Sequence, residues 1–556
     1  MQKSNHFWHL LFWTQVIVGF AGCAQVGQLQ GGKKDETPPG IDSTKSSKSY
    51  QTKVEKANFQ LTYDEWIKLD DPINKMNVSP PLRYRPTVTL TGRTVNFAFD
   101  KREILRKEAT YHINFGESIK DLNEGNIAKE NDFVFSTGPV IDTMSQSFLV
   151  LDALSGEPVE KVNVLIHENL SDTAVLKDLP FYMGTTNKAG ACTIQNMRAG
   201  TYHFFALSDK NQNLKFDLPT ESFAMLDTAI NFEKSGQQPI ILKLSLERPR
   251  TKIKSKEFVH DGLVKIVYNQ PPLTQSLRSI PQTGTFVDYQ QDTTFVYYPP
   301  AESDLQIIVQ ADQLNDTITL RKLIKRNLVL PKLGYKTNPV SFAQTIIPNK
   351  PIEVLFNFPL TSFNQDSIAL YADTTKKTRI SPKVTIDSAH RNTLRLNHPY
   401  EDKKTYLLYF KKNSVSDHYG RSIDSTFEQK YVAADSKELA ALTIQIDSLN
   451  PIYNYIVTLQ TTEKVELVRQ EVIGKKQFLQ TYDGLNIEDY FVKIVEDRNN
   501  NHQWDPVNYQ TKQLPEYIYM QKAEGLRPNF TVEKIIEFST KNITETNLNK
   551  RQSIQK

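Results

Sequence analysis

Residues 202–217 read YHFFALSDKNQNLKFD, and residues 490–505 read YFVKIVEDRNNNHQWD. In both stretches a strand-like run that begins with tyrosine leads into the pattern D-x-N-x-N, and a second aspartate follows an aromatic residue at the same spacing. Two matches with identical internal spacing indicate a duplicated module rather than a coincidence of composition. The rest of the chain is therefore interpreted as the surroundings of two copies of one β-rich unit.

The length and composition of the chain predict several β-rich domains. A chain of 556 residues is too long for one hydrophobic core, so domains of about 100 residues each are expected. Thr, Val, Ile, Tyr and Phe recur in short runs bounded by Asn, Asp, Pro and Gly, which is typical of many short strands. The net charge of +4 is close to neutral and no basic block stands out, so nucleic acid is not an expected partner. The predicted fold class is all-β, with tandem β-sandwich domains in an elongated chain.

The N-terminal segment predicts export and a lipid anchor. An apolar stretch at residues 7–20, FWHLLFWTQVIVGF, follows Lys3 and is too short for a membrane-spanning helix, which needs about 20 apolar residues. It fits the core of a signal peptide over residues 1–22. The small residues before Cys23 resemble the bacterial lipobox. This resemblance implies that diacylglycerol is joined to the Cys23 thiol and anchors the protein to the outer membrane.

The second cysteine is predicted to be structural. Cys192 lies in the strand-like run GACTI at residues 190–194, where a small buried hydrophobic side chain is more expected than a nucleophile. The chain has only two cysteines, so none is left to pair with Cys192 once Cys23 carries a lipid. Packed sheets, rather than a disulfide, are therefore expected to stabilise the domains.

The region after Cys23 combines a polar tether with a set of β-strand motifs. Residues 23–57 are rich in Gln, Gly, Lys, Ser and Thr and are predicted to form a flexible, lipid-anchored tether. GGKKDETPP at residues 31–39 is followed by strand-like runs, by SPPL at residues 79–82 and by FSTG at residues 135–138. This order of motifs resembles the N-terminal SbsA-type bacterial Ig-like domain of Bacteroidota lipoproteins. The resemblance implies an Ig-like β-sandwich over residues 58–140.

The glycine and tyrosine positions around the first copy resemble a second family. The spacings T-x3-G at residues 186–190 and N-x3-G-x-Y at residues 196–202 are similar to those of the carboxypeptidase-regulatory-like or prealbumin-like β-sandwich. In that fold glycine permits a tight turn before the strand that begins with tyrosine. This resemblance implies a prealbumin-like sandwich over residues 141–247. The second copy at residues 490–505 predicts another one over residues 437–540.

The outline of the first Ig-like region also recurs. TYLLYF at residues 405–410 repeats TYHINF at residues 110–115, and the same offset carries Gly125 onto Gly420. A degenerate Ig-like domain is therefore predicted over residues 340–436. The remaining segments are assigned to a small β-domain over residues 248–339 and a disordered tail over residues 541–556.

The two D-x-N-x-N loops are the strongest candidates for a binding site. Ca²⁺ prefers six to eight oxygen ligands, and alternate side chains in a tight loop can converge on one ion. The candidate Ca²⁺ ligands are Asp209, Asn211, Asn213 and Asp217 in the first loop and Asp497, Asn499, Asn501 and Asp505 in the second.

Two features of these loops differ from an EF-hand. The sixth position holds Leu214 or His502 in place of glycine, and the twelfth holds Thr220 or Asn508 in place of glutamate. In the first loop Glu221, one residue later, could serve instead. The alternative is that the Asp and Asn side chains bond to their own backbone in Asx-turns and shape the hairpin without an ion. The sequence leaves both interpretations open.

The sequence contains no recognisable catalytic motif. The ten histidines are scattered, and the motifs H-E-x-x-H, G-x-S-x-G, G-x-G-x-x-G and the phosphate-binding P-loop are absent. A non-enzymatic function is therefore expected. The leading hypothesis is a binding or scaffolding protein of the cell envelope, held away from the outer membrane as a rod of domains whose loops make the contacts.

Two other functions fit the same sequence. Tyr63, Trp66, Trp504 and Tyr509 could form the stacking surface of a glycan-binding or glycan-degrading surface protein, or they could fill sandwich cores. An envelope-assembly component that contacts proteins on the periplasmic side is the second alternative. Residues 24–28, AQVGQ, lack the acidic cluster that resembles the surface-export signal of Bacteroidota lipoproteins. Both the surface and the periplasmic side are therefore open as the location.

Overall fold

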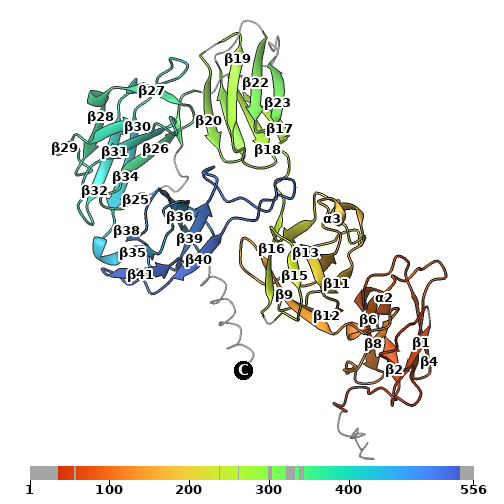
Figure 1. Ribbon diagram of the computed structural model, residues 1–556. Coiled ribbons are helices and arrows are strands. Elements are labelled where there is room, and N and C mark those ends of the chain that lie inside the picture. The colour runs from red at the N-terminus through yellow and green to blue at the C-terminus, as the bar shows by residue number, and fades with distance from the viewer. Residues whose placement is uncertain are drawn as a thin grey trace, which may run out of the picture.

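The computed structural model describes residues 35–538 apart from 56–57, 237, 261, 283, 299–303, 321–331 and 337–343. Regular structure in this part is almost all β, and its only α-helices are the one-turn segments α2 (Pro72–Lys75) and α3 (Ala174–Lys177). The strands form sandwiches that follow one another along the chain (Figure 1). The predicted all-β class with tandem β-sandwiches is confirmed. The predicted signal peptide, the lipidation site at Cys23 and the predicted tail lie outside the described residues.

The N-terminal sandwich has two three-stranded sheets and a two-stranded ribbon. β5 pairs with β1 and β4, β6 pairs with β3 and β8, and β2 pairs with β7. Buried side chains alternate with more exposed ones, as in β5, where Val95 and Phe97 point into the core. Phe59 stacks on both Phe97 and Phe133 there. The bounds are β1 Phe59–Thr62, β2 Ile67–Leu69, β3 Asn77–Ser79, β4 Thr87–Thr91, β5 Thr94–Ala98, β6 Thr110–Asn114, β7 Ile119–Asp121 and β8 Asp132–Ser136.

The segment before β1 belongs to this sandwich, where a flexible tether was predicted. The Tyr50 N–H donates to the Val134 carbonyl at 2.6 Å, and Gln51 pairs in parallel with β8. These bonds add a polar segment to the edge of a sheet, whose backbone groups need hydrogen-bond partners. The tether prediction over residues 23–57 is therefore wrong for residues 41–54, because edge pairing orders a chain that is too polar to form a core.

The second sandwich, over residues 144–246, carries the first D-x-N-x-N loop. Its strands lie in the order β11-β10-β13-β14-β16-β9-β12, with β15 paired to β13, and β9 and β16 run parallel. Gly190 has a φ of +69° in the turn before β12, and a side chain there would meet the Val150 carbonyl oxygen, so this tight turn requires glycine. The bounds are β9 Met144–Asp152, β10 Asn163–His167, β11 Tyr182–Thr185, β12 Ala191–Met197, β13 Gly200–Leu207, β14 Ser222–Met225, β15 Ile230–Phe232 and β16 Ile240–Leu246.

The first two sandwiches share one continuous hydrophobic core, formed by buried residues within 59–244. Polar contacts cross the same boundary. The Met183 N–H donates to Ser79 Oγ at 3.1 Å, and the Arg106 guanidinium donates to the Pro180 carbonyl at 2.7 Å. The two sandwiches are therefore packed against each other as one unit.

The third sandwich covers residues 253–320. Its four-stranded sheet, β17-β18-β21-β20, and its three-stranded sheet, β19-β22-β23, enclose a separate core that includes Ile266 and Val309. The bounds are β17 Ile253–His260, β18 Leu263–Tyr268, β19 Gln275–Ile280, β20 Phe286–Gln290, β21 Thr293–Tyr297, β22 Leu305–Ala311 and β23 Leu314–Leu320.

The fourth sandwich repeats the topology of the first. β31 pairs with β26 and β30 as β5 does with β1 and β4, and β32 pairs with β28 and β34 as β6 does with β3 and β8. The Tyr111 hydroxyl accepts from the Arg106 N–H, and the Tyr406 hydroxyl accepts from the Glu401 N–H, both at 2.8 Å. The two sandwiches are thus built as copies of one unit. The bounds are β24 Tyr335–Lys336, β25 Gln344–Ile346, β26 Ile352–Phe356, β27 Leu360–Phe363, β28 Ile368–Tyr371, β29 Arg379–Ile380, β30 Lys383–Ile386, β31 Thr393–Asn397, β32 Thr405–Phe410, β33 Val415–Asp417 and β34 Phe427–Ala433.

The last sandwich repeats the topology of the second. β35 pairs with β38 antiparallel and with β41 in parallel, as β9 pairs with β12 and β16, and β39 lies between β36 and β40 as β13 lies between β10 and β14. The Tyr202 hydroxyl donates to the Arg198 carbonyl at 2.9 Å, and the Tyr490 hydroxyl donates to the Asn486 carbonyl at 3.0 Å. The repeat seen in the sequence therefore extends to the whole sandwich. The bounds are β35 Ala440–Asp447, β36 Asn454–Thr461, β37 Glu466–Val472, β38 Phe478–Leu485, β39 Tyr490–Asp497, β40 Ile518–Ala523 and β41 Thr531–Glu537.

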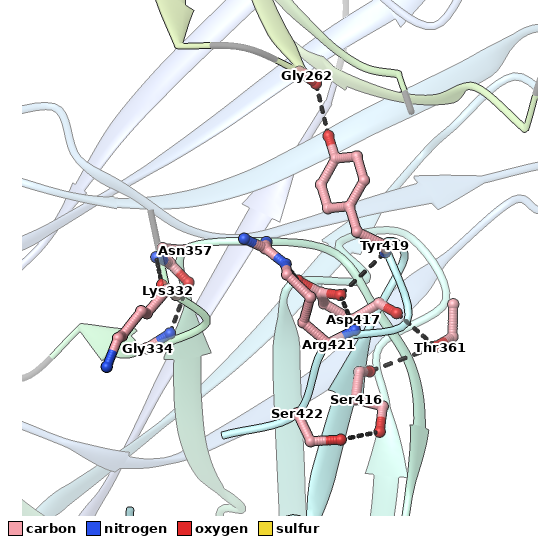
Figure 2. A network of polar contacts seen from close by, with 10 residues as sticks. All are labelled: Gly262, Lys332, Gly334, Asn357, Thr361, Ser416, Asp417, Tyr419, Arg421 and Ser422. Carbon is pink, nitrogen blue, oxygen red and sulfur yellow. Dashed lines mark hydrogen bonds and ion pairs between the residues drawn. The ribbon is translucent and has the colours of Figure 1, made fainter. Parts of the chain in front are cut away.

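The third and fourth sandwiches meet in the polar junction drawn in Figure 2. The Tyr419 hydroxyl donates to the Gly262 carbonyl of the third sandwich at 2.5 Å. Asp417 shapes the turn that carries Tyr419, because its carboxylate accepts from the backbone N–H groups of Tyr419 and Arg421 at 2.9 Å each. Tyr297 of the third sandwich belongs to the buried core of the fourth. This junction is therefore both apolar and hydrogen-bonded.

The chain turns back so that the last sandwich contacts the second. In Figure 1 a dark-blue loop of the last sandwich reaches toward the sandwich that carries α3. Val507 and Tyr509 of this loop lie in the same buried cluster as Phe205 and Phe223 of the second sandwich. The open rod expected from the sequence is therefore wrong for the part from β9 to β41, because an apolar surface on the second sandwich is covered by the last one.

Candidate functional site

The first D-x-N-x-N loop closes through its own hydrogen bonds. The Asp209 carboxylate accepts from the backbone N–H groups of Gln212 at 2.7 Å and Leu214 at 2.8 Å. The side-chain amide of Asn213 donates to the Asp217 carboxylate at 2.7 Å, and that of Asn211 donates to the same carboxylate at 3.0 Å. The four predicted residues of this loop are thus brought together around one turn.

The second loop has the same geometry. The Asp497 carboxylate accepts from the N–H groups of Asn501 at 3.1 Å and His502 at 2.8 Å. Asn501 donates to the Asp505 carboxylate at 2.7 Å, and Asn499 donates to the same oxygen. Both loops therefore place their two aspartates and two asparagines alike, as the shared spacing predicts.

The sixth loop position, where an EF-hand has glycine, has a positive φ in both loops. Leu214 has a φ of +58° and His502 has a φ of +64°, although neither is glycine. A bulky residue with a positive φ costs about 1 to 2 kcal/mol. The network of hydrogen bonds to the preceding aspartate holds this strained turn in place.

A buried glutamate completes each loop. Glu221 accepts from the N–H groups of Lys210 at 3.0 Å and Asp217 at 3.2 Å, and Glu516 accepts from those of Arg498 at 2.8 Å and Asp505 at 3.1 Å. The two glutamates thus occupy equivalent places. Burial, followed by the nearby carboxylates of Asp505 and Asp497, raises the pKa of Glu516 to about 7.

Glu516 could not be found from the shared spacing, because an insertion separates it from the second motif. Residues 218–220 lie between the last aspartate and the glutamate in the first loop, whereas residues 506–515 lie there in the second. Aligning the two copies on Tyr202 and Tyr490, which lie in the strands before the loops, does not bring the two glutamates together, since they lie at different offsets from these tyrosines. A glutamate just before β40 that matches the one before β14 was the signal that could have found it.

These oxygen-bearing side chains are the ones that could hold Ca²⁺. Within the described residues, no three or more His, Cys, Asp or Glu side chains are grouped as a metal site would require. The amide oxygens of Asn211 and Asn213 accept from the N–H groups of Asn213 and Lys215 as in Asx-turns, while their amide nitrogens face Asp217. To bind an ion, the asparagine side chains would have to rotate so that their oxygens face the two carboxylates. Ca²⁺ binding by either loop stays a prediction.

The insertion after the second loop forms a hairpin, here called the clasp (residues 506–515). Asn508 and Gln513 exchange backbone hydrogen bonds of 2.9 Å within it, and at its base the Glu516 N–H donates to the Asp505 carbonyl at 3.0 Å. The clasp lies against the second sandwich, where the Val507 N–H donates to Ser245 Oγ at 2.9 Å. The second D-x-N-x-N region is therefore joined to the sandwich that carries the first one.

Both faces of β13 are apolar in its C-terminal half, which is why the outer face needs cover there. Tyr202, Phe204 and Ala206 point into the main core, whereas Phe205 and Leu207 point into the cluster that holds the clasp. The run FFAL at residues 204–207 shows this in the sequence, because an uninterrupted apolar run is typical of a strand that is buried on both faces.

The aromatic side chains proposed as a glycan surface do not form one. Tyr63 is fully buried in the first sandwich, whereas Trp66 is 62% exposed. Tyr509 is buried against the second sandwich, and the Trp504 indole N–H donates to the Glu516 carbonyl at 3.0 Å. These residues belong to different sandwiches or are buried, so the glycan-stacking hypothesis based on them is wrong.

Cys192 and two strand histidines, His112 and His203, have structural surroundings. Cys192 is buried in β12, and its burial raises the pKa of the thiol to about 12, so the predicted role as a small buried side chain is confirmed. His112 lies 3.0 Å from Asp132, and the His203 ring stacks on Phe205.

Comparison with known proteins identifies the first sandwich. Residues 35–137 match the family model described as a bacterial Ig-like domain. This match begins at residue 35, in agreement with the ordered segment that precedes β1. No curated protein matches the chain. Within the described part of the chain, every helix is too short or too polar to cross a bilayer.

Solved structures of other β-rich proteins are similar over large parts of the chain. Domains 1–6 of the surface layer protein SbsC share 12% identity, with 89% of this chain and 68% of that chain covered and a TM-score of 0.16. BcpA, the major pilin subunit of Bacillus cereus, shares 9% identity, with 71% of this chain and 99% of that chain covered and a TM-score of 0.14. Similarities of this size carry no argument about function.

Proposed function

We propose that this protein is a non-catalytic binding or scaffolding protein of the bacterial cell envelope, anchored to the outer membrane by a lipid on Cys23. The observation that carries the proposal is the bacterial Ig-like domain at residues 35–137, followed by further β-sandwiches that are joined by contact-making loops. Such scaffolds place function on loops that rigid sheets support. The apolar stretch and small residues that precede Cys23 support the lipid anchor.

An anchor at Cys23 would set the order in which the sandwiches extend from the membrane. A lipid on Cys23 lies on the N-terminal side of the Ig-like sandwich, so that sandwich is nearest the membrane in the proposed arrangement. Its common core with the second sandwich makes these two a stiff base. The sandwiches from β17 to β41, which return to the second one through the clasp, are then the parts presented to a partner.

The lipid anchor is tested by comparing the full chain with a Cys23→Ala variant in a bacterium that processes lipoproteins. We expect a clickable fatty acid to label the wild type, and detergent phase separation to place it in the detergent phase. The variant should be unlabelled and aqueous. An unlabelled wild type that is still exported would refute the anchor.

Protease treatment of intact cells then distinguishes the two membrane faces. Loss of the sandwiches from intact cells places them at the surface and supports contact with external partners. Survival until the outer membrane is permeabilised places them in the periplasm and supports a role in envelope assembly. In either case, in-cell crosslinking to the sandwiches from β17 to β41 should capture the partner.

We also propose Ca²⁺ as the ligand of the two D-x-N-x-N loops. The supporting observation is that each loop brings two aspartates and two asparagines around one turn, which a buried glutamate ties down by accepting from backbone N–H groups. Oxygen ligands of this kind are those that Ca²⁺ selects. Bound Ca²⁺ would stiffen the turns from which the contact between the second and last sandwiches is built.

A further inference from the structure

The second sandwich carries an apolar surface, here called the groove, that is covered by a segment from far along the chain. The groove is lined by side chains from β10, α3, the first loop, β13 and β14, namely Leu165, Val175, Phe205, Phe216, Phe223 and Met225. The Tyr509 ring enters this groove and meets Phe223 edge-on at 5.4 Å and Phe216 edge-on at 6.1 Å between ring centres. Tyr509 is 7% exposed, so it is an anchor in the sense of a buried interface residue.

Polar contacts at the rim of the groove fix the direction of the clasp. The Tyr509 hydroxyl donates to the Asp172 carbonyl, and the Tyr509 N–H donates to the Glu247 carboxylate. Lys512 lies 3.2 Å from the Asp172 carboxylate and 3.8 Å from the centre of the Tyr509 ring. On the other side of the clasp, Arg248 donates to the Gln503 side chain at 3.0 Å. The groove thus complements the clasp in shape, in hydrogen-bonding groups and in charge.

The clasp is a preformed hairpin, and the equivalent sandwich lacks it. Its backbone is hydrogen-bonded within itself between Asn508 and Gln513, and its base is closed between Asp505 and Glu516. The second sandwich has the same topology with only residues 218–220 at the equivalent place. A preformed hairpin loses little conformational freedom when it docks, which favours binding.

We propose that the groove is a docking site for an aromatic hairpin. The clasp of the same chain fills it and closes the sandwiches from β9 to β41 into a ring. When this contact is released, a second copy of the chain supplies the same hairpin. The second copy is the partner that fits because it carries the segment whose complementarity is visible here. The contact joins two different surfaces, so exchange between copies is heterologous and can link copies in series. This inference does not depend on the lipid anchor or on Ca²⁺.

The docking site is tested with a fluorescent synthetic peptide of residues 505–516 and the full chain carrying Tyr509→Ala. We expect the peptide to bind this variant, because its own clasp lacks the anchor, and to bind the wild type at least about tenfold more weakly. A peptide in which the tyrosine is replaced by alanine should bind roughly 30-fold more weakly than the unmodified one. Absence of binding to the Tyr509→Ala chain would overturn the docking site.

Exchange between copies is tested by mixing two variants that lack different halves of the contact. Tyr509→Ala removes the anchor, and Phe216→Ala opens the groove of the other copy. After mixing ¹⁵N-labelled Tyr509→Ala with unlabelled Phe216→Ala, a zero-length carbodiimide crosslinker should join Lys512 of the unlabelled chain to Asp172 of the labelled chain. Finding this crosslink only within one label would overturn the second copy as the partner. If Phe216→Ala fails to fold, adding unlabelled wild type to the labelled Tyr509→Ala chain gives the same readout.

Discussion

His167 offers a direct test of how the outer face of the second sandwich is packed. It lies in β10 opposite His203 of β13, and its ring meets Phe205 edge-on with 5.6 Å between ring centres. The side chain is 1% exposed, and no group among the described residues is a hydrogen-bond partner of Nε2. A buried imidazole whose Nε2 has no partner is expected to be held in its neutral form.

Burial lowers the pKa of His167 from 6.5 to about 4, with smaller effects from Asp178, which favours the charged form, and from Arg106 and His203, which oppose it. The unfolded chain binds a proton near pH 6.5, whereas the folded chain does so only near pH 4. Stability is therefore complete above pH 6.5 and falls as the pH drops from 6.5 toward 4. The loss that this shift implies is about 3 kcal/mol.

The assay is hydrogen exchange of the full chain, followed by mass spectrometry on peptides that cover β10 and β13. After correction for the pH dependence of the intrinsic exchange rate, we expect the free energy of opening to fall by about 3 kcal/mol between pH 7 and pH 4. His167→Leu should remove most of this loss but leave the smaller part that the lowered pKa of His203 contributes. His390→Leu, in the fourth sandwich, is the matched control and should leave it unchanged. An equal loss in the wild type and in His167→Leu would refute the assignment of a buried, neutral imidazole.

Three further predictions concern turns and loops. Gly190→Ala places a Cβ 2.5 Å from the Val150 carbonyl oxygen and should destabilise the second sandwich by more than about 2 kcal/mol. In the control Gly92→Ala the glycine has a φ of +61° and no atom lies within 4 Å of the added Cβ, so the first sandwich should lose only about 1 to 2 kcal/mol. Hydrogen exchange compares the two losses, and equal losses would argue against the clash. Tyr406→Phe removes the hydroxyl that accepts from a backbone N–H and should lower the free energy of opening of the fourth sandwich by about 1 kcal/mol; an unchanged exchange rate would contradict it. Chelation of Ca²⁺ should lower the melting temperature, since Ca²⁺ at about 100 times its Kd adds about 2.7 kcal/mol, and Asp497→Asn with Asp209→Asn should abolish that response; a wild type indifferent to chelator would leave the loops as Asx-turns.

The parts of the fold that sequence could predict are those set by neighbouring residues. Alternation in runs such as the one around Phe97 predicts half-buried strands, and those strands are present. The tyrosines at 111 and 406, which the repeat aligns, make the same hydrogen bond in the first and fourth sandwiches. The duplicated loops have the same geometry because each aspartate bonds to N–H groups only a few residues away. The limits of the individual domains stay a prediction.

The parts that sequence could not predict depend on contacts between distant residues. The segment from 41 to 54 is too polar to reveal that its backbone completes a sheet edge. The bond between Val507 and Ser245 joins positions 262 residues apart, and no local pattern marks either of them. The sequence predicts a rod of domains because strand periodicity and linker composition report on each sandwich separately and not on contacts between sandwiches. Closure of the chain depends on surfaces that match only after both sandwiches have formed.

The two copies of the motif show why the turns were easier to predict than the contact between them. Each turn needs its aspartate, its asparagines and a residue that accepts a positive φ, so these features recur at the same spacing in both copies. The contact uses unlike parts, because Phe216 lies within the first motif whereas Tyr509 lies in an insertion after the second. A comparison of the two copies shows the residues that they share, whereas the contact between them is made by residues that they do not share. The apolar run at residues 204–207 instead indicates that a second contact is needed. Its alternate side chains lie on opposite faces of β13, so one face packs in the main core and the other must be buried by another part of the chain.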